Sequence, residues 1–120
     1  MLAGARCSIV KAMTLLQKRD AARHRRRLED LTDTRRRLRT ALAELMPGQQ
    51  VIVFGSLTKP GVFNARSDVD LALVGPPSGL DPLKLTSALM ERLARPVDVV
   101  VLDQCRFREK IQREGEVWTT

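Results

Sequence analysis

The sequence predicts an α/β fold in which helices are arranged around a small β-sheet that follows a long N-terminal helix. Three short segments rich in valine, isoleucine and leucine indicate strands. Segments whose apolar residues recur every three or four positions indicate helices. A long N-terminal stretch without glycine or proline indicates a helix of its own. The predicted order is helix, strand, strand, helix, strand, helix around one sheet.

The N-terminal helix is expected from about residue 11 to residue 46, and a break near Thr32 to Thr34 is part of this prediction. Pro47 and Gly48 end the helix, because proline cannot continue it and glycine readily turns the chain. Leucines at steps of three, four and seven residues give it one apolar face: Leu28, Leu31, Leu38, Leu42 and Leu45.

Two strands are expected close together in the middle of the chain. The first covers residues 50–54 and ends at Gly55-Ser56. The second covers residues 68–74 and is terminated by a Gly-Pro-Pro sequence. Strands separated by so short a segment can be neighbours in one sheet.

The last third of the chain predicts two helices and one strand. Asp81 caps a helix over residues 81–94, whose leucines lie four positions apart and are expected to cover the sheet. A strand at residues 97–102 contains a single acid, and a helix over residues 104–113 follows it.

Length and composition restrict the class of protein. The chain has 120 residues, of which 43% are hydrophobic and 29% charged, as in one water-soluble domain. No apolar run suits a membrane span or a signal peptide, so a cytoplasmic location is expected, with Met1 or Met13 as the start. Cys7 and Cys105 are expected to be free thiols. His24 lies among arginines, which excludes a histidine metal centre and a serine–histidine triad.

The formal net charge of +7 comes from one segment. Residues 18–39 contain ten Lys and Arg against four Asp and Glu, whereas residues 40–120 contain nine basic and ten acidic residues. This segment either binds nucleic-acid phosphates or is a solvated or partner-facing helix. The second interpretation is favoured, because only three Phe, one Trp and no Tyr are present to stack on bases. Its leucines fit self-association or docking on a partner equally well.

Three carboxylates, Asp68, Asp70 and Asp98, lie at or inside the most apolar strand segments. Aspartate is disfavoured there and unpaired burial is costly, so a cation is expected to compensate the charge. Asp68 and Asp70 are two residues apart on a strand and project from the same face. Such oxygen ligands select Mg²⁺, and Asp98 can supply the carboxylate of a second metal position. The competing interpretation is that these acids are simply solvated.

The Gly55-Ser56 pair at the end of the first strand suits phosphate binding. Glycine lets the backbone approach a phosphate closely, and the Ser56 hydroxyl with nearby N–H groups can donate to its oxygens. A Gly-Ser pair alone carries little weight. The combination is specific, because Asp68 follows Ser56 by twelve residues and opens an Asp-x-Asp strand, with a lone aspartate in the third strand.

Residues 53–56 together with residues 67–71 resemble the signature of the DNA polymerase β-type nucleotidyltransferase superfamily. At this length the chain most resembles the minimal nucleotidyltransferase (MNT) antitoxin family, over about residues 48–118. The tail from Ile111 to Trp118 resembles the closing helix and Glu-Gly segment of that family. The resemblance implies the polymerase β-like palm, a small mixed β-sheet with helices on one face, in a nucleotidyltransferase domain at residues 48–120. The basic helical segment at residues 1–47 would then pack on this domain or on a partner.

The resemblance also implies roles for individual residues. Asp68 and Asp70 would bind Mg²⁺, and Asp98 would complete the metal site and help to deprotonate an acceptor hydroxyl. Pro60 and the Val62-Phe63 pair depart from the usual charged loop of the family. Nucleotide binding is assigned to Gly55, Ser56, Lys59 and Ser67.

The function implied by the resemblance is that of an antitoxin. It would act on a HEPN-domain RNase toxin by transferring AMP from ATP to a hydroxyl of that toxin, with Mg²⁺ as cofactor. One alternative is a binding antitoxin whose nucleotide site is idle. Another is a transferase that modifies a small molecule or an RNA end, for which the basic helix is the supporting feature. The nucleotide, the acceptor and the number of copies in the assembly, including a homo-oligomer, stay open.

Overall fold

The computed structural model describes residues 2–75 and 81–120, with side chains from residue 15 onward in those ranges. Its centre is one four-stranded sheet with the strand order β3-β2-β1-β4. β1 is antiparallel to both β2 and β4, whereas β2 and β3 are parallel. The strands are β1 (Gln50–Phe54), β2 (Val69–Leu73), β3 (Val97–Val101) and β4 (Glu116–Thr119).

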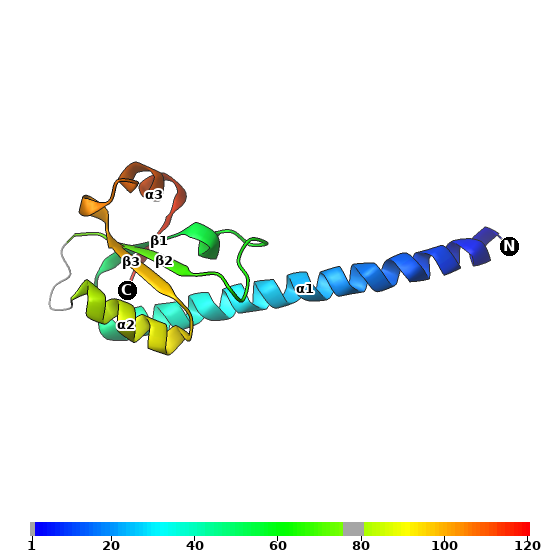
Figure 1. Ribbon diagram of the computed structural model, residues 1–120, viewed down its shortest axis with the longest axis horizontal. Coiled ribbons are helices and arrows are strands. Elements are labelled where there is room, and N and C mark those ends of the chain that lie inside the picture. Colours follow the sequence, from blue (N-terminus) through cyan, green and yellow to red (C-terminus); the bar gives the residue numbers. More distant parts are fainter. Residues whose placement is uncertain (1, 76–80) are drawn as a thin grey trace.

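Helices cover both faces of this sheet to different extents. α1 (Leu2–Leu45) and α2 (Pro82–Leu93) lie side by side against one face, and the short α3 (Arg108–Glu114) lies on the other (Figure 1). The predicted class, a small mixed sheet behind a long N-terminal helix, is confirmed. The predicted placement of helices on one face of the sheet describes α1 and α2. α3 partly covers the opposite face.

The strands alternate between the two faces, as the period of two in a strand requires. Odd-numbered residues such as Val51, Val53 and Leu71 join the main core with α1 and α2. Even-numbered residues such as Ile52 and Ala72 join a smaller cluster under α3. The α3-facing side of the sheet therefore has few apolar partners, and this is where the polar strand residues lie.

α1 is continuous, so the predicted break near Thr32 to Thr34 is wrong. Thr34 is buried against the domain together with the main core, and tertiary packing of this kind overrides weak local helix propensity. Asp33 also forms ion pairs with Arg36 (2.5 Å) and Arg37 (3.0 Å) one turn further along.

The C-terminal elements differ from the prediction in two ways. Residues Leu102–Gln104 form a 3₁₀ turn, and α3 begins only at Arg108. β4 was not predicted and pairs antiparallel with β1, with Trp118 opposite Val51. α1 begins at Leu2 rather than at about residue 11. The boundaries of β1, β2, α2 and β3 agree with the prediction to within two residues, and Asp81 caps α2 by accepting from the Leu83 N–H (3.2 Å).

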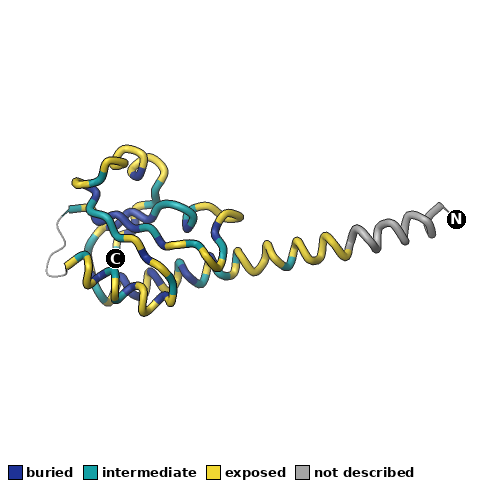
Figure 2. The backbone as a smooth tube through the Cα atoms, viewed as in Figure 1, coloured by how far each residue is buried: buried dark blue, intermediate teal, exposed yellow. Residues whose placement is uncertain are grey.

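The N-terminal half of α1 projects away from the domain (Figure 1). The molecule measures 72 × 29 × 21 Å along its principal axes. Lys and Arg side chains from residue 18 to residue 27 are exposed, whereas burial begins at Leu31 (Figure 2). The described helices include none that is both long enough and apolar enough to cross a membrane. The last four turns of α1 pack into the domain core. The proposed domain boundary at residue 47, between the basic helical segment and the nucleotidyltransferase domain, remains a prediction.

Leu38 and Leu16 provide a test of which half of α1 contributes to folding. Leu38 is fully buried, whereas Leu16 is 63% exposed on the projecting half. Leu38→Ala is expected to lower the free energy of unfolding by about 2–5 kcal/mol, because it removes buried methyl groups and leaves a cavity. Leu16→Ala is expected to change it by less than about 0.5 kcal/mol. Urea denaturation followed by circular dichroism measures both values, and equal effects would contradict this packing.

Candidate active site

Three side chains lie in one row across the α3-facing side of the sheet. Phe54 of β1 pairs with Asp70 of β2, and Asp70 pairs with Asp98 of β3. Residues paired in register share a face, so the two carboxylates are direct neighbours. The end of β1 and the beginnings of the parallel strands β2 and β3 meet here.

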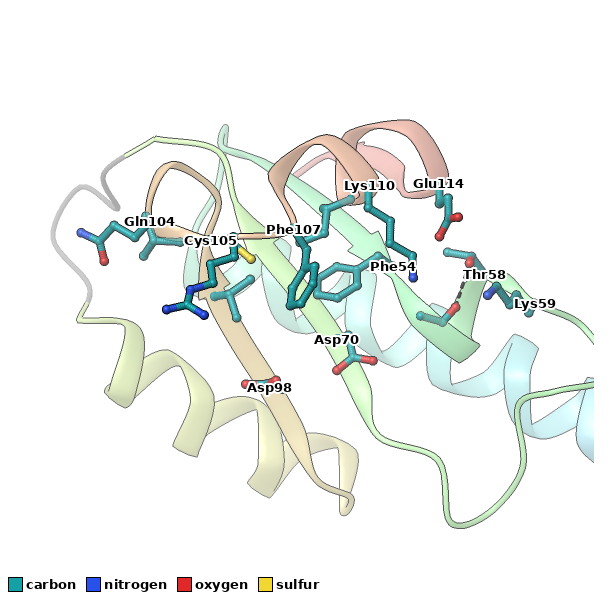
Figure 3. Close-up of a pocket in the computed structure, with 15 residues that line it drawn as sticks. Phe54, Thr58, Lys59, Asp70, Asp98, Gln104, Cys105, Phe107, Lys110 and Glu114 are labelled. Carbon is teal, nitrogen blue, oxygen red and sulfur yellow. Dashed lines mark hydrogen bonds between the residues drawn. The ribbon is translucent and has the colours of Figure 1, made fainter.

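A pocket of about 730 Å³ lies between this row and the segment that contains α3 (Figure 3). Four of the predicted site residues line it: Gly55, Lys59, Asp70 and Asp98. Three others, all in the described part of the chain, do not line it: Ser56, Ser67 and Asp68. The structure thus brings the glycine of the turn, one lysine and two carboxylates together. The volume of the pocket is in the range of small-molecule binding sites.

The carboxylates repel one another across the strands. Burial raises the pKa of Asp70 above its ordinary value of 3.8, and the charges of Asp98 and then of Asp68 raise this pKa further. Asp68 is thus close enough to be felt electrostatically, although it lies outside the pocket lining.

The donor chemistry of Asp70 and Asp98 fits a hard divalent cation. In proteins Mg²⁺ is usually bound by one or two carboxylates, with water and substrate phosphates as the other ligands. Within the described residues, no three His, Cys, Asp or Glu side chains converge closely enough to hold a metal ion by themselves. A metal here would therefore depend on substrate oxygens as well as on the protein.

The turn after β1 is shaped by Gly55. Its φ of +75° is in the left-handed region, and a Cβ at this position would lie 2.4 Å from Asp70 Oδ2. The following 3₁₀ turn (Gly55–Thr58) is closed by the Thr58 hydroxyl, which donates to the Gly55 carbonyl (2.8 Å). Leu57 is fully buried and its carbonyl accepts from Arg35 of α1 (3.2 Å). The backbone around Gly55 is therefore fixed directly beside Asp70.

Arg95 fixes the loop that leads to Asp68. One of its guanidinium nitrogens donates to both carboxylate oxygens of Asp30 in α1 (3.0 and 3.1 Å). The other nitrogen donates to the carbonyls of Ser67 (3.2 Å) and Asn64 (3.4 Å). The guanidinium also stacks 4.6 Å from the ring centre of Phe63, which is fully buried. The Phe63 that departs from the family's charged loop is thus an anchor of this loop in the core.

Replacing Arg95 by methionine is expected to destabilise the protein by about 2 kcal/mol or more. Arg95 is only 11% exposed, and its loss leaves the Asp30 carboxylate and two loop carbonyls without these charged hydrogen bonds. Arg92→Met is the matched control, because Arg92 pairs with Glu44 at the surface of α1 and α2, where ion pairs contribute little. Thermal unfolding distinguishes the two, and equal melting temperatures would contradict this role.

Sequence reasoning did not identify the α3 side of the pocket. Gln104, Phe107 and Lys110 all line it, as does Thr58 of the turn. Locally these residues look like an ordinary exposed helix and its approach, which gives no sign of a site. The sequence signal that could have indicated this side of the pocket is an aromatic residue, Phe107, followed by a basic residue, Lys110, about one helical turn later, shortly after the strand that contains Asp98. Cys105 also lines the pocket and is a free thiol, while the Cys7 side chain lies outside the described ones.

A family profile described as "Polymerase beta, Nucleotidyltransferase" matches residues 37–119. The chain belongs to this nucleotidyltransferase family. The match begins inside α1, at the part of the helix that packs against the sheet. A search of curated proteins gave no match.

Solved structures show the same fold. A chain of a toxin–antitoxin crystal structure with AMP-PNP is 25% identical, with a TM-score of 0.56 over 71% of this chain and 73% of the other. A chain described as a candidate minimal nucleotidyltransferase is 29% identical, with a TM-score of 0.58 over 72% and 93% of the two chains. A chain of the toxin–antitoxin MntA-HepT, at 22% identity and a TM-score of 0.53 over 74% and 73%, shares the fold.

The nucleotidyltransferase fold generally uses a divalent metal ion and a nucleoside triphosphate. Asp70 and Asp98 are the residues of this chain that would hold such an ion, with Asp68 close by. Lys59 and the turn at Gly55 lie at the same pocket and would face the phosphates.

Proposed function

We propose that this member of the nucleotidyltransferase family is a Mg²⁺-dependent antitoxin that transfers AMP from ATP to a hydroxyl of a partner toxin. The partner proposed is a HEPN-domain RNase. The observation that carries the proposal is the paired carboxylates Asp70 and Asp98 beside the Gly55 turn, in one pocket. The likeness to a toxin–antitoxin complex with AMP-PNP supports both the nucleotide and the kind of partner.

Residues that line the pocket and residues beside it have different roles in nucleotidyl transfer. Gly55 and its turn, with Ser56 and Lys59, bind the β- and γ-phosphates of ATP, and Ser67 supports the loop that ends at Asp68. Asp70 and Asp98, with Asp68, would hold the divalent ion, which when bound would neutralise phosphate charge at the α-phosphorus. In-line transfer of this kind depends mainly on positioning and electrostatic stabilisation.

The transfer requires no reactant other than ATP and the acceptor hydroxyl. The acceptor oxygen forms a bond to the α-phosphorus of ATP, and the bond from that phosphorus to the bridging oxygen of the pyrophosphate breaks. Asp98 accepts the proton of the acceptor hydroxyl as the new bond forms. Pyrophosphate leaves with the bonding electron pair, and the acceptor carries AMP.

The second candidate function is a binding antitoxin that masks its toxin by contact. The observation that favours it is the half of α1 that projects from the domain, whose Lys and Arg side chains from residue 18 to residue 27 are exposed (Figure 1). The projecting half of α1, with its exposed Lys and Arg side chains, would then be the docking surface. In that case the nucleotide pocket would not be needed for neutralisation.

Intact mass spectrometry separates the two functions. The purified protein is incubated with ATP and Mg²⁺, with and without the HEPN-domain partner, and the masses of both proteins are measured. We expect AMP to be added to the partner by the wild type and not by the Asp68→Ala/Asp70→Ala double variant. Glu91→Ala is the control, because Glu91 is exposed on α2 across the sheet. A double variant that neutralises the toxin as well as the wild type does would refute the enzymatic function.

A further inference from the structure

Part of the pocket has no role in the proposed binding of phosphates and metal. At one end lie Thr58 and Lys59 of the turn, with Lys110 of α3 above them (Figure 3). At the other end lies Gln104, and between the two ends Phe54 and Phe107 stand over the carboxylates (Figure 3). Glu114 of α3 also lies at the end with the lysines, and Arg106 lines the pocket as well. The pocket therefore has one end with two lysines and an acid, a middle with the carboxylates and an aromatic shelf, and a far end with Gln104.

Phe107 is the residue that most needs an explanation. It is 66% exposed although its large apolar ring could have been buried, and it lines the pocket rather than the core beneath α3. Phe54 is half-buried, lies in the same row as Asp70 and lines the pocket too. Aromatic rings placed in this way bind flat heterocycles, and each stacked base contributes about 1–3 kcal/mol.

Gln104 lines the far end of the pocket, and its exposed side chain is turned away from the two rings (Figure 3). The rings therefore offer a surface for stacking and no hydrogen bonds that would distinguish one base from another. Stacking of this kind tolerates every base, because every base has a π-face.

The order of these groups matches a nucleoside triphosphate laid along the pocket. Lys59 and Lys110 at one end suit the phosphates, Asp70 and Asp98 lie at the middle, and the two rings offer a surface for the base. We propose that Phe107 and Phe54 form the subsite for the nucleotide base, with Lys110 as a second cation on the phosphates. This inference rests on the proposed function, since it assumes that the Gly55 end holds phosphates.

Comparing ATP with inorganic tripolyphosphate tests the subsite, because tripolyphosphate has phosphates and no base. Calorimetric titrations with Mg²⁺ are made on the full chain with ATP, GTP and tripolyphosphate. Phe107→Ala is expected to weaken ATP binding about 10-fold and to leave tripolyphosphate binding unchanged. ATP and GTP are expected to bind with similar affinity, because stacking on the two rings does not distinguish their bases. Lys110→Ala is expected to weaken both ATP and tripolyphosphate.

Leu83→Ala is the control for surface exposure, since Leu83 is 76% exposed on α2, on the other face of the sheet. ATP and tripolyphosphate affinities that fall equally in Phe107→Ala would refute the subsite. An unchanged ATP affinity with a raised KM for the acceptor would also refute it, because the shelf would then hold the acceptor. Both results leave the proposed function standing if transfer occurs. A wild type that binds neither ATP nor tripolyphosphate would overturn the proposed function and the subsite together.

Discussion

Gly55→Ala is expected to lower the rate of nucleotide transfer by about 10²-fold or more while the protein still folds. Two effects add at this position. The backbone has a φ of +75°, which alanine adopts at a cost of about 1–2 kcal/mol. The new Cβ would also lie 2.4 Å from Asp70 Oδ2, so the carboxylate has to move away. Moving a reactive group by about 1 Å is enough to cost about 10²-fold in rate.

Gly48→Ala is the matched control for the backbone effect. Gly48 has nearly the same φ, +74°, and no described atom lies within 4 Å of the Cβ that it would gain. Both variants should therefore show a similar loss of stability from the backbone, and only Gly55→Ala should lose activity. Single-turnover transfer assays and thermal unfolding of both variants measure this. Equal activity in the two variants would mean that the Gly55 turn does not position Asp70.

The elements that could be predicted are those whose pattern is local. β1 and β2 are short apolar runs ended by glycine, and α2 has a capping Asp81 with leucines four positions apart. β4 could not be predicted, because it is four residues long and is stabilised by distant partners. Trp118 packs into the core and its ring contacts the guanidinium groups of Arg35 and Arg39 in α1, and these contacts do not exist until the sheet has formed.

The carboxylate row could be predicted in part, and for a physical reason. Acids inside apolar strands conflict with local preference, and a conflict of this kind in the sequence indicates a site. The register that places Asp70 opposite Asp98 depends on β2 and β3 being parallel neighbours. The order of the strands along the chain does not determine which strands are neighbours in the sheet. The α3 side of the pocket could not be predicted, because only the tertiary fold brings Phe107 and Lys110 to the same pocket as these carboxylates.

Asp70→Asn is expected to abolish transfer and, in the absence of metal, to stabilise the fold. Removing one ligand of a metal that stabilises the reacting phosphate by several kcal/mol lowers the rate by at least about 10²-fold. The stability effect has the opposite sign because the folded pKa of Asp70 is raised above 3.8 by burial and by the neighbouring acids. From pH 3.8 up to that raised pKa, the folded state binds more protons than the unfolded chain, so stability falls as pH rises.

The metal-free Asp70→Asn protein should therefore melt at a higher temperature than the wild type at neutral pH. This difference should disappear below about pH 3, where the wild-type carboxyl is protonated in both states. Mg²⁺ with ATP should raise the melting temperature of the wild type and have a much smaller effect on the variant. Asp103→Asn is the control, since Asp103 is exposed and pairs only at the surface with Arg108. A variant that melts below the wild type at every pH would show that Asp70 is a structural residue rather than a site whose charge repulsion a bound cation relieves.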